Sequence, residues 1–210
     1  MNELYIFFLP VSFLLGSIPF GFLAAKLKGI DIRQKGSGNI GATNVTRLLG
    51  WKIGLPVLLL DILKGAVFPL TIRLLYGESQ ELLSLFCGVA AVLGHMFSPF
   101  LKLKGGKGVA TSFGVFAVLA PGPTLITLIV FLSLKKIFGF VSIGSIGGAV
   151  TLPISYYLLS LIDGRNFNTP IFWAIVSISL TILVLHRTNL IRLIKGQEFA
   201  SDKEKYKAQE

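Results

Sequence analysis

The chain has 210 residues, of which 53% are hydrophobic and only 14% are charged, and its mean hydropathy is +0.75. Roughly a quarter of the residues of a soluble domain are charged, so this composition excludes a soluble globular domain. Apolar runs of roughly 20 residues recur along the chain and predict an all-α polytopic membrane protein. The net charge of +10 is typical of the basic loops on one side of such a protein, and no nucleic acid is expected as a partner.

About seven transmembrane helices are predicted, separated by polar or Pro/Gly-rich segments. In chain order they cover 3–25, 53–76, a stretch from 82 to the polar segment at 94, 108–120, 124–138, 140–162 and 169–185. The sequence Ala-Pro-Gly-Pro at 120–123 is a turn signal between the fourth and fifth helices. Polar residues at 163–168 predict another turn before the seventh helix. The whole chain, 1–210, is predicted to form a single membrane domain.

Three polar, glycine-rich loops interrupt the apolar sequence at about 26–52, 94–111 and 186–198. With seven crossings, all three loops lie on one face of the membrane, and this face receives 17 of the 20 basic residues. The side that carries the excess of Lys and Arg is cytoplasmic. We therefore expect the N-terminus outside, the C-terminus in the cytoplasm, and a multi-pass protein of the cell (inner) membrane whose active site faces the cytoplasm.

The first loop has the composition of a phosphate site. Its segment KGSGNIGATNVTR combines three glycines with hydroxyl, amide and guanidinium side chains. Glycine lets backbone N–H groups approach an anion closely, and hydroxyl and Arg donors suit phosphate. The spacing of Gly36, Gly38 and Gly41 also matches a dinucleotide fingerprint, but a membrane helix precedes it where a strand is required. The bland alternative is a flexible loop that only turns the chain.

The second loop contains a glycine turn around one lysine. Gly105-Gly106-Lys107-Gly108 resembles part of a Walker A loop, but Leu101 stands where that loop needs its first glycine, and no Ser or Thr follows the lysine. An ATPase loop is therefore not predicted. Lys107 precedes a helix N-terminus, and it can contact phosphate there through its charge and with the free N–H groups of the helix.

Two histidines lie near the ends of apolar runs. His186 begins the third loop with Asn189 and Glu198, and His95 ends the third helix. Neither histidine has a carboxylate five residues later, so the H-x4-D acyltransferase motif is absent. No cluster of Cys and His residues predicts a metal site. For His95 taken alone, a buried structural role and a functional role are equally open.

A charged pair interrupts the second apolar run. Asp61 and Lys64 are three residues apart and share one helix face. A charge at mid-membrane costs ~2.5 to 3.5 kcal/mol on insertion scales, so we expect the two to pair with each other or with the polar loops. A structural and a catalytic role are both open. Cys87, the only cysteine, is expected to be a small core residue.

The three polar stretches resemble, in order, the three signature motifs of the bacterial acyl-phosphate:glycerol-3-phosphate acyltransferases of the PlsY type. They read GSGNIGATNVTR, GHMFSPFLKLKGGKGVAT and HRTNLIRLIKGQE, and GSIPFG and DILKG in the first two helices resemble that family too. The resemblance implies seven membrane helices with cytoplasmic motifs. It also implies a reaction, in which a fatty acyl group passes from acyl phosphate to the 1-hydroxyl of glycerol 3-phosphate. The products are lysophosphatidic acid and phosphate, and the reaction starts phospholipid biosynthesis.

The loops and the resemblance together define a predicted site. Its catalytic residues are Ser37, Arg47, Lys107, His186 and Asn189. Its substrate-binding residues are Gly36, Gly38, Asn39, Gly41, Thr43, Asn44, His95, Lys104, Gly105, Gly106, Gly108 and Glu198. In the family, the serine, the arginine and the glycine turn serve the phosphates, and the histidine and asparagine of the third motif are linked to activity. The glutamate of that motif is linked more to the integrity of the site.

The mechanism expected is direct acyl transfer, with no cofactor and no metal, because Cys87 lies within an apolar helix and Ser37 has no partner base recognisable from spacing. Acyl phosphate is an activated mixed anhydride, so the protein has to hold two anions and orient the attacking hydroxyl. A phosphate oxygen of a substrate, His95 and His186 are open candidates for the acceptor of the hydroxyl proton. Expected partners are acyl phosphate, glycerol 3-phosphate and the lipid bilayer, and an enzyme that makes acyl phosphate is a candidate protein partner. The alternative function is a membrane transporter of phosphorylated metabolites, although no internal repeat supports it.

Overall fold

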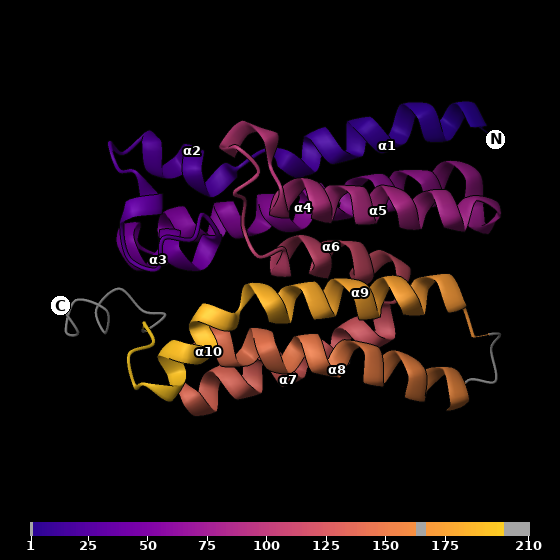
Figure 1. Cartoon of the computed structure of the whole chain (residues 1–210). Helices are drawn as coiled ribbons and strands as arrows, with labels where there is room; N and C mark the ends of the chain where they lie inside the picture. Colours follow the sequence, from indigo (N-terminus) through magenta and orange to yellow (C-terminus); the bar gives the residue numbers. More distant parts are fainter. Residues whose placement is uncertain (1, 163–166, 200–210) are drawn as a thin grey trace.

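A computed structural model describes residues 2–162 and 167–199 of the chain. Within these two ranges the chain forms ten α-helices and three short 3-10 helices, and it forms no strand. The long helices lie side by side along one common direction (Figure 1). The protein is therefore all-helical, as the composition predicts. The tail beyond Phe199 and most of the polar turn predicted at 163–168 lie outside the described residues.

The first half of the chain contains five α-helices. They are α1 (Asn2–Ser17), α2 (Phe20–Lys26), α3 (Ala42–Leu49), α4 (Trp51–Tyr76) and α5 (Glu81–Met96). The second half contains the other five. They are α6 (Val109–Leu119), α7 (Pro121–Phe138), α8 (Val141–Ile162), α9 (Thr169–Leu185) and α10 (Arg187–Ile194). The 3-10 helices are Ile32–Gln34, Gly77–Gln80 and Pro99–Leu101.

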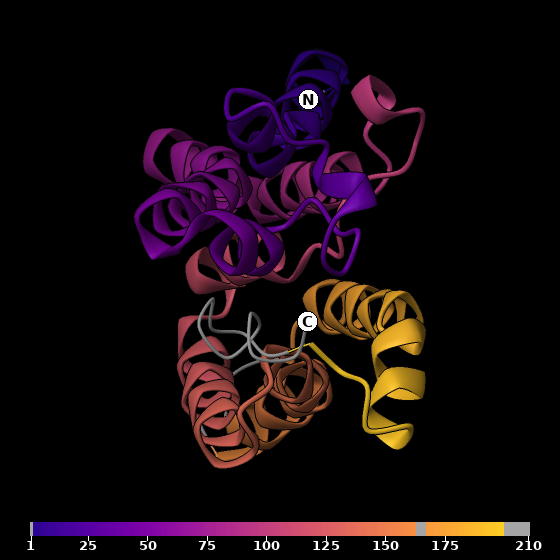
Figure 2. The ribbon, with the colours of Figure 1, turned by 90° about the vertical axis from the view of Figure 1, so that its left-hand side faces the viewer.

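The helices form two groups, with α6 between them. Figure 2 shows α1 to α5 on one side and α7 to α10 on the other. Helix α1 packs on α5, α4 on α6, and α7 on α8. One core cluster joins the groups, because buried Phe116 of α6 lies in the same cluster as Val92 of α5 and Ile175 of α9. This arrangement brings the α3 end of the first group beside the α10 end of the second.

Four segments of the described chain are long and apolar enough to cross a membrane, and a fifth qualifies if α9 and α10 count as one bent span. One of the four, Trp51–Leu101, has 51 residues and contains both α4 and α5. Helix α6 has only 11 residues, whereas a straight crossing needs about 20. The protein is thus a helical membrane protein, and its crossings are unequal in length.

The first predicted helix is correct in extent, and the structure divides it into two helices within one candidate span, Tyr5–Lys26. The structure ends α1 at Ser17 and begins α2 at Phe20. Pro19 causes the break, because it has no N–H to continue the helix, and its ψ angle of 73° is far from the helical value. At this break the Ile18 carbonyl accepts from the Phe20 N–H at 3.1 Å and also from Nζ of Lys64 at 2.8 Å.

The predicted turn at 120–123 is also corrected. Helix α7 begins at Pro121, so the segment expected as a loop forms the first turn of a helix. Proline is well tolerated there, because the first N–H groups of a helix have no partner within it. Only Ala120, with φ −143° and ψ 63°, remains as the connection. The predicted bounds 169–185 of the seventh helix are confirmed.

Two short helices lie inside loops that the sequence predicted as irregular. Helix α3 occupies part of the first loop, and it buries Asn44, Val45 and Arg47 on one face. Helix α10 continues α9 after a bend of 49°. Both are amphipathic and too short to register as apolar runs. They position the polar side chains of the first and third loops.

Candidate active site

A cavity of about 280 Å³ lies between the two helix groups. Its polar end is lined by residues of all three predicted loops, including Ser37, Arg47, Lys107, His186 and Asn189. The rest of the cavity is lined mainly by apolar side chains, together with several Ser and Thr hydroxyls. These side chains come from α6, α7, α8 and α9. The cavity thus connects a cationic end with a groove inside the helical bundle.

The first loop is shaped by the buried amide of Asn44. Its Nδ2 donates to the Asn39 carbonyl (2.9 Å) and the Lys35 carbonyl (3.1 Å). Its Oδ1 accepts from the Ser37 backbone N–H (3.1 Å) and from Nη1 of Arg47 (2.9 Å). The donors and the acceptor of this amide are used within the loop. Asn44 therefore lines the cavity mainly as the residue that holds Ser37 and Arg47 in place.

Two glycines make this compact loop sterically possible. Gly36 has a φ of +57° and Gly38 a φ of +72°, values that other residues rarely adopt. A side chain on Gly36 would also overlap Oδ1 of Asn44. Neither glycine lines the cavity, so their contribution is the backbone path.

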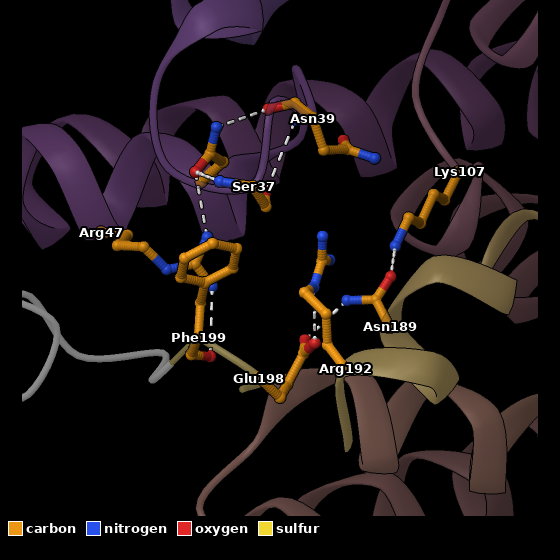
Figure 3. Close-up of polar contacts among 9 residues, drawn as sticks. Ser37, Asn39, Arg47, Lys107, Asn189, Arg192, Glu198 and Phe199 are labelled. Atoms are coloured by element: carbon orange, nitrogen blue, oxygen red, sulfur yellow. Dashed lines mark hydrogen bonds and ion pairs between the residues drawn. The ribbon is translucent and has the colours of Figure 1, made fainter. Parts of the chain in front are cut away.

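The Arg47 guanidinium is held against the end of the described chain. Arg47 is 4% exposed. Its Nη2 donates to the Phe199 carbonyl at 3.5 Å. The centroid of the Phe199 ring lies 5.4 Å from Cζ of Arg47. The same ring lies 5.0 Å from Cζ of Arg192. Figure 3 shows Phe199 beside Arg47 at the cavity. One aromatic ring therefore contacts two cations, which is a favourable cation–π arrangement.

A chain of polar contacts links the second and third loops (Figure 3). Lys107 donates from Nζ to Oδ1 of Asn189. Asn189 in turn donates from Nδ2 to Oε1 of Glu198 (2.6 Å). Arg192 pairs with the other oxygen of Glu198 (3.1 Å). The carboxylate thereby orients the Asn189 amide so that its oxygen, rather than its nitrogen, faces Lys107.

The protonation of Lys107 is shifted by its surroundings. Burial lowers the pKa of Lys107 from its ordinary value to about 8. The Glu198 carboxylate opposes this shift in the pKa, and the positive charges of Arg192 and Arg47 add to it. The ammonium form is therefore only moderately favoured at neutral pH, and an incoming anion would stabilise it.

His186 lies at the junction of α9 and α10. It is 4% exposed and lines the cavity, and its Nδ1 lies 2.8 Å from the Ile182 carbonyl. A carbonyl oxygen only accepts hydrogen bonds, so this contact places the proton of the neutral ring on Nδ1. The other ring nitrogen, Nε2, is then the acceptor.

The glycine turn of the second loop folds back on the end of α5. The Gly105 N–H donates to the Met96 carbonyl and the Gly106 N–H to the His95 carbonyl, both at 3.0 Å. Because these two N–H groups are already used, they are not offered to an anion in the cavity. Gly108 has a φ of +81° at the start of α6, and the turn as a whole presents Lys107.

The structure brings most of the predicted site residues to one cavity. All five predicted catalytic residues line it, together with Asn39, Gly41, Thr43, Asn44, His95, Gly108 and Glu198. The predicted binding residues that do not line it are Gly36, Gly38, Lys104, Gly105 and Gly106. Lys104 is exposed on the surface. Among the described residues, no group of three or more His, Cys, Asp or Glu could hold a metal ion.

Sequence reasoning missed two residues at the polar end, Arg192 and Phe199. Arg192 follows Asn189 by three residues, a spacing that places both on one face of a helix, so recognition of α10 would have indicated it. Phe199 gave no signal, because it follows the last motif in a tail without pattern. Asp61 also lines the cavity, although the sequence left its role open.

The fold and the site together define a class. This is a helical membrane protein with a cationic end in its cavity and an apolar groove beyond it, an arrangement suited to an amphiphile with an anionic head. Comparison with known proteins gives the family, because residues 6–196 match the family described as glycerol-3-phosphate acyltransferase. The chain belongs to this family, and it is an acyltransferase of the PlsY type.

Relatives and solved structures agree with this assignment. The glycerol-3-phosphate acyltransferase of Leptospira borgpetersenii serovar Hardjo-bovis (strain JB197) is 49% identical over 90% of this chain and 87% of its own. That of Aquifex aeolicus (strain VF5) is 44% identical over 92% and 97%. The crystal structure of PlsY (YgiH), an integral membrane glycerol 3-phosphate acyltransferase, in the glycerol 3-phosphate form matches with a TM-score of 0.84. It is 38% identical and covers 93% of this chain and 94% of that one.

Proposed function

We propose that this protein transfers a fatty acyl group from acyl phosphate to the 1-hydroxyl of glycerol 3-phosphate. The products are lysophosphatidic acid and phosphate, and the reaction is the first step of phospholipid biosynthesis. The observation that carries this proposal is the single cavity in which Arg47 and Lys107 lie at one end and an apolar groove at the other. The solved relatives in a glycerol 3-phosphate form and a lysophosphatidic acid form support the acceptor and the product.

The two ends of the cavity suit the two parts of an acyl phosphate. Its tail would lie in the groove, where Phe113, Phe131 and Leu152 are among the apolar lining residues. Burial of a chain in the membrane gains about 0.8 kcal/mol per CH₂. Its phosphate would lie near Arg47 and Lys107, because the two cations neutralise the charge that develops on the leaving group.

Direct transfer fits the described part of the site better than an acyl-enzyme. Cys87 is buried in a cluster with Ile72 and Leu83, away from the residues that line the cavity. The Ser37 hydroxyl accepts a long hydrogen bond from the Asn39 N–H (3.5 Å), and among the described residues no hydrogen bond joins it to a histidine. A serine nucleophile needs an adjacent base. The candidate proton acceptors are then a substrate phosphate oxygen, the Nε2 of His186 and His95, and both histidines line the cavity.

The proposed topology has seven crossings, with the N-terminus outside and the C-terminus in the cytoplasm of a cell (inner) membrane. Two observations support seven. The segment Trp51–Leu101 turns at the 3-10 helix Gly77–Gln80 and so supplies two crossings. The short α6 lies between the basic second loop and α7, which ends with Lys135 and Lys136, so a crossing by α6 puts these two basic segments on the same side. The basic loops then face the cytoplasm with the polar end of the cavity, and the chain forms one membrane domain over 1–210.

A donor comparison tests the proposal. Purified protein in lipid nanodiscs receives glycerol 3-phosphate with either acyl phosphate or acyl-CoA, and lysophosphatidic acid is measured by mass spectrometry. We expect lysophosphatidic acid from glycerol 3-phosphate when acyl phosphate is the donor, and none when acyl-CoA is the donor. Robust turnover with acyl-CoA as the sole donor would contradict the proposed donor. Uptake of labelled glycerol 3-phosphate into sealed vesicles, without product, would instead favour the transporter alternative.

A further inference from the structure

A buried ion pair lies beside the site and has no role in the mechanism given above. Asp61 and Lys64 of α4 are 2% and 3% exposed, and Nζ of Lys64 lies 2.8 Å from Oδ1 of Asp61. The same Nζ donates to the Ile18 carbonyl at 2.8 Å, in the break between α1 and α2. A buried ion pair adds little net stability compared with packed apolar side chains, so a role in geometry explains this pair better than a role in stability.

The pair connects directly to His95 at the end of α5. Nδ1 of His95 lies 3.7 Å from Oδ1 of Asp61, a distance for an ionic contact and too long for a hydrogen bond, and this nitrogen forms no hydrogen bond with any described group. His95 is itself 6% exposed and lines the cavity with Asp61. The imidazole therefore lies between a fixed carboxylate and the second loop.

His95 contacts the glycine turn that carries Lys107. Its carbonyl accepts the hydrogen bond from the Gly106 N–H at 3.0 Å. Its ring lies so close to Gly106 that a Cβ on this residue would overlap Nε2. A displacement of the ring would therefore move the turn, and the next residue along the chain is Lys107.

We propose that Asp61 and Lys64 are positioning residues for the phosphate-binding Lys107. The contacts run from the Ile18 carbonyl through Lys64 and Asp61 to His95, and then through Gly106 to Lys107. The pair fixes the imidazole, and the imidazole fixes the turn, so the ammonium is held where the phosphate of a substrate arrives. This inference rests on the proposed function in one respect, because it takes Lys107 to bind phosphate.

A thermodynamic cycle with inorganic phosphate tests this coupling. The affinity of the purified protein for phosphate is measured by calorimetry in four forms, namely the unchanged protein, Asp61→Asn, Lys107→Ala and the double variant. When Lys107 is present, we expect Asp61→Asn to weaken phosphate binding about 10-fold. With Lys107→Ala present, the same substitution should change it by less than about twofold, because coupled residues give non-additive effects.

Two further variants protect the test against simple unfolding. Asp31→Asn makes the same chemical change in an exposed ion pair, in which Asp31 lies 2.8 Å from Arg33, and should leave phosphate affinity unchanged. If Asp61→Asn alone does not fold, Asp61→Asn with Lys64→Met removes both charges and leaves none unpaired. If Asp61→Asn with Lys64→Met folds, it should show the same weakening of phosphate binding, again only when Lys107 is present.

The outcomes separate this inference from the proposed function. Equal weakening with and without Lys107 would show a general structural role and overturn the positioning role. Unweakened phosphate binding in a folded Asp61 variant would overturn it as well. An unchanged protein that binds phosphate through Lys107 but makes no lysophosphatidic acid would contradict the proposed function alone.

Discussion

At the scale of single residues, Lys107 is expected to set the alkaline limit of activity. The protonated ammonium binds phosphate and the neutral amine does not. Because the pKa of Lys107 is lowered to about 8, the charge is lost as the pH rises through this value. The ratio kcat/KM reports ionisation of the free enzyme, so kcat/KM for acyl phosphate, whose phosphate is proposed to lie near Lys107, should fall about tenfold per pH unit above about pH 8.

The matched variant for this prediction is Lys107→Arg. A guanidinium remains charged throughout the accessible range, so the alkaline limb should move to higher pH even if the maximum activity is lower. A limb that stays near pH 8 in the arginine variant would assign it to another group.

Replacement of Arg47 should lower the activity far more than replacement of Lys52, although both are basic residues of the first loop region. Arg47 is buried at the cavity and is held by Asn44, whereas Lys52 is exposed at the start of α4. We expect Arg47→Ala to lower kcat/KM by about 10²-fold or more and Lys52→Ala to change it by less than about twofold. Initial rates of lysophosphatidic acid formation measure both, and equal losses would point to general surface charge.

Phe199 is expected to strengthen substrate binding through the guanidiniums of Arg47 and Arg192, which both contact its ring. A cation–π contact gives about 0.5 to 1 kcal/mol at partly exposed sites, which corresponds to about two- to fivefold in affinity. Phe199→Leu should raise the KM for acyl phosphate by this factor, and Phe199→Tyr, which keeps an aromatic face, should not. If Phe199→Tyr raises the KM as much as Phe199→Leu does, the cation–π contact is not the cause of the change.

At the scale of elements, small residues allow α4 and α6 to pack closely. A Cβ on Gly114 of α6 would overlap the carbonyl oxygen of Ile62 in α4, which is backbone and cannot rotate away. We expect Gly114→Ala to destabilise the protein by about 1 to 3 kcal/mol, the usual cost of overpacking. Thermal unfolding in detergent, followed by tryptophan fluorescence, measures this loss.

Gly122 in α7 provides the control for that substitution. A Cβ there would meet only the end of the Leu159 side chain, at 3.3 Å, and a flexible side chain can move. Gly122→Ala should therefore unfold within a few degrees of the unchanged protein. Equal destabilisation of the two variants would argue against close α4–α6 packing as the cause.

The elements also show what could be predicted from the sequence. The bounds of α8 and α9 follow from long apolar runs between polar segments, and these were predicted nearly residue by residue. Helix α3 was missed because its pattern is amphipathic over only two turns. The contact of Asp61 with His95 was out of reach, because it joins two helices whose side-chain directions depend on tertiary packing. Likewise Arg47, Lys107 and His186 could be named from their loops, but the convergence of their side chains at one cavity could be seen only in the structure.

At the scale of the whole molecule, the two helix groups place the polar end of the cavity at one end of the bundle. Figure 1 shows α3 and α10 at that end and the turn between α4 and α5 at the opposite end. In a membrane, the two ends of the bundle would lie on opposite sides. The excess of basic residues in the loops at the α3 and α10 end supports the proposal that this end is cytoplasmic.

Cysteine labelling can establish this orientation directly. Single cysteines replace Ser79, in the turn after α4, and Gln197, after α10, and both positions are exposed. Cys87 is first changed to Ser, so that the introduced thiol is the only one in the chain. In intact cells, a membrane-impermeant maleimide should label the cysteine at 79 and not the one at 197. Inside-out vesicles should reverse the pattern, because the cytoplasmic face is then outermost. Labelling of both positions from the same side would mean an even number of crossings between them and would contradict the proposed seven-crossing topology.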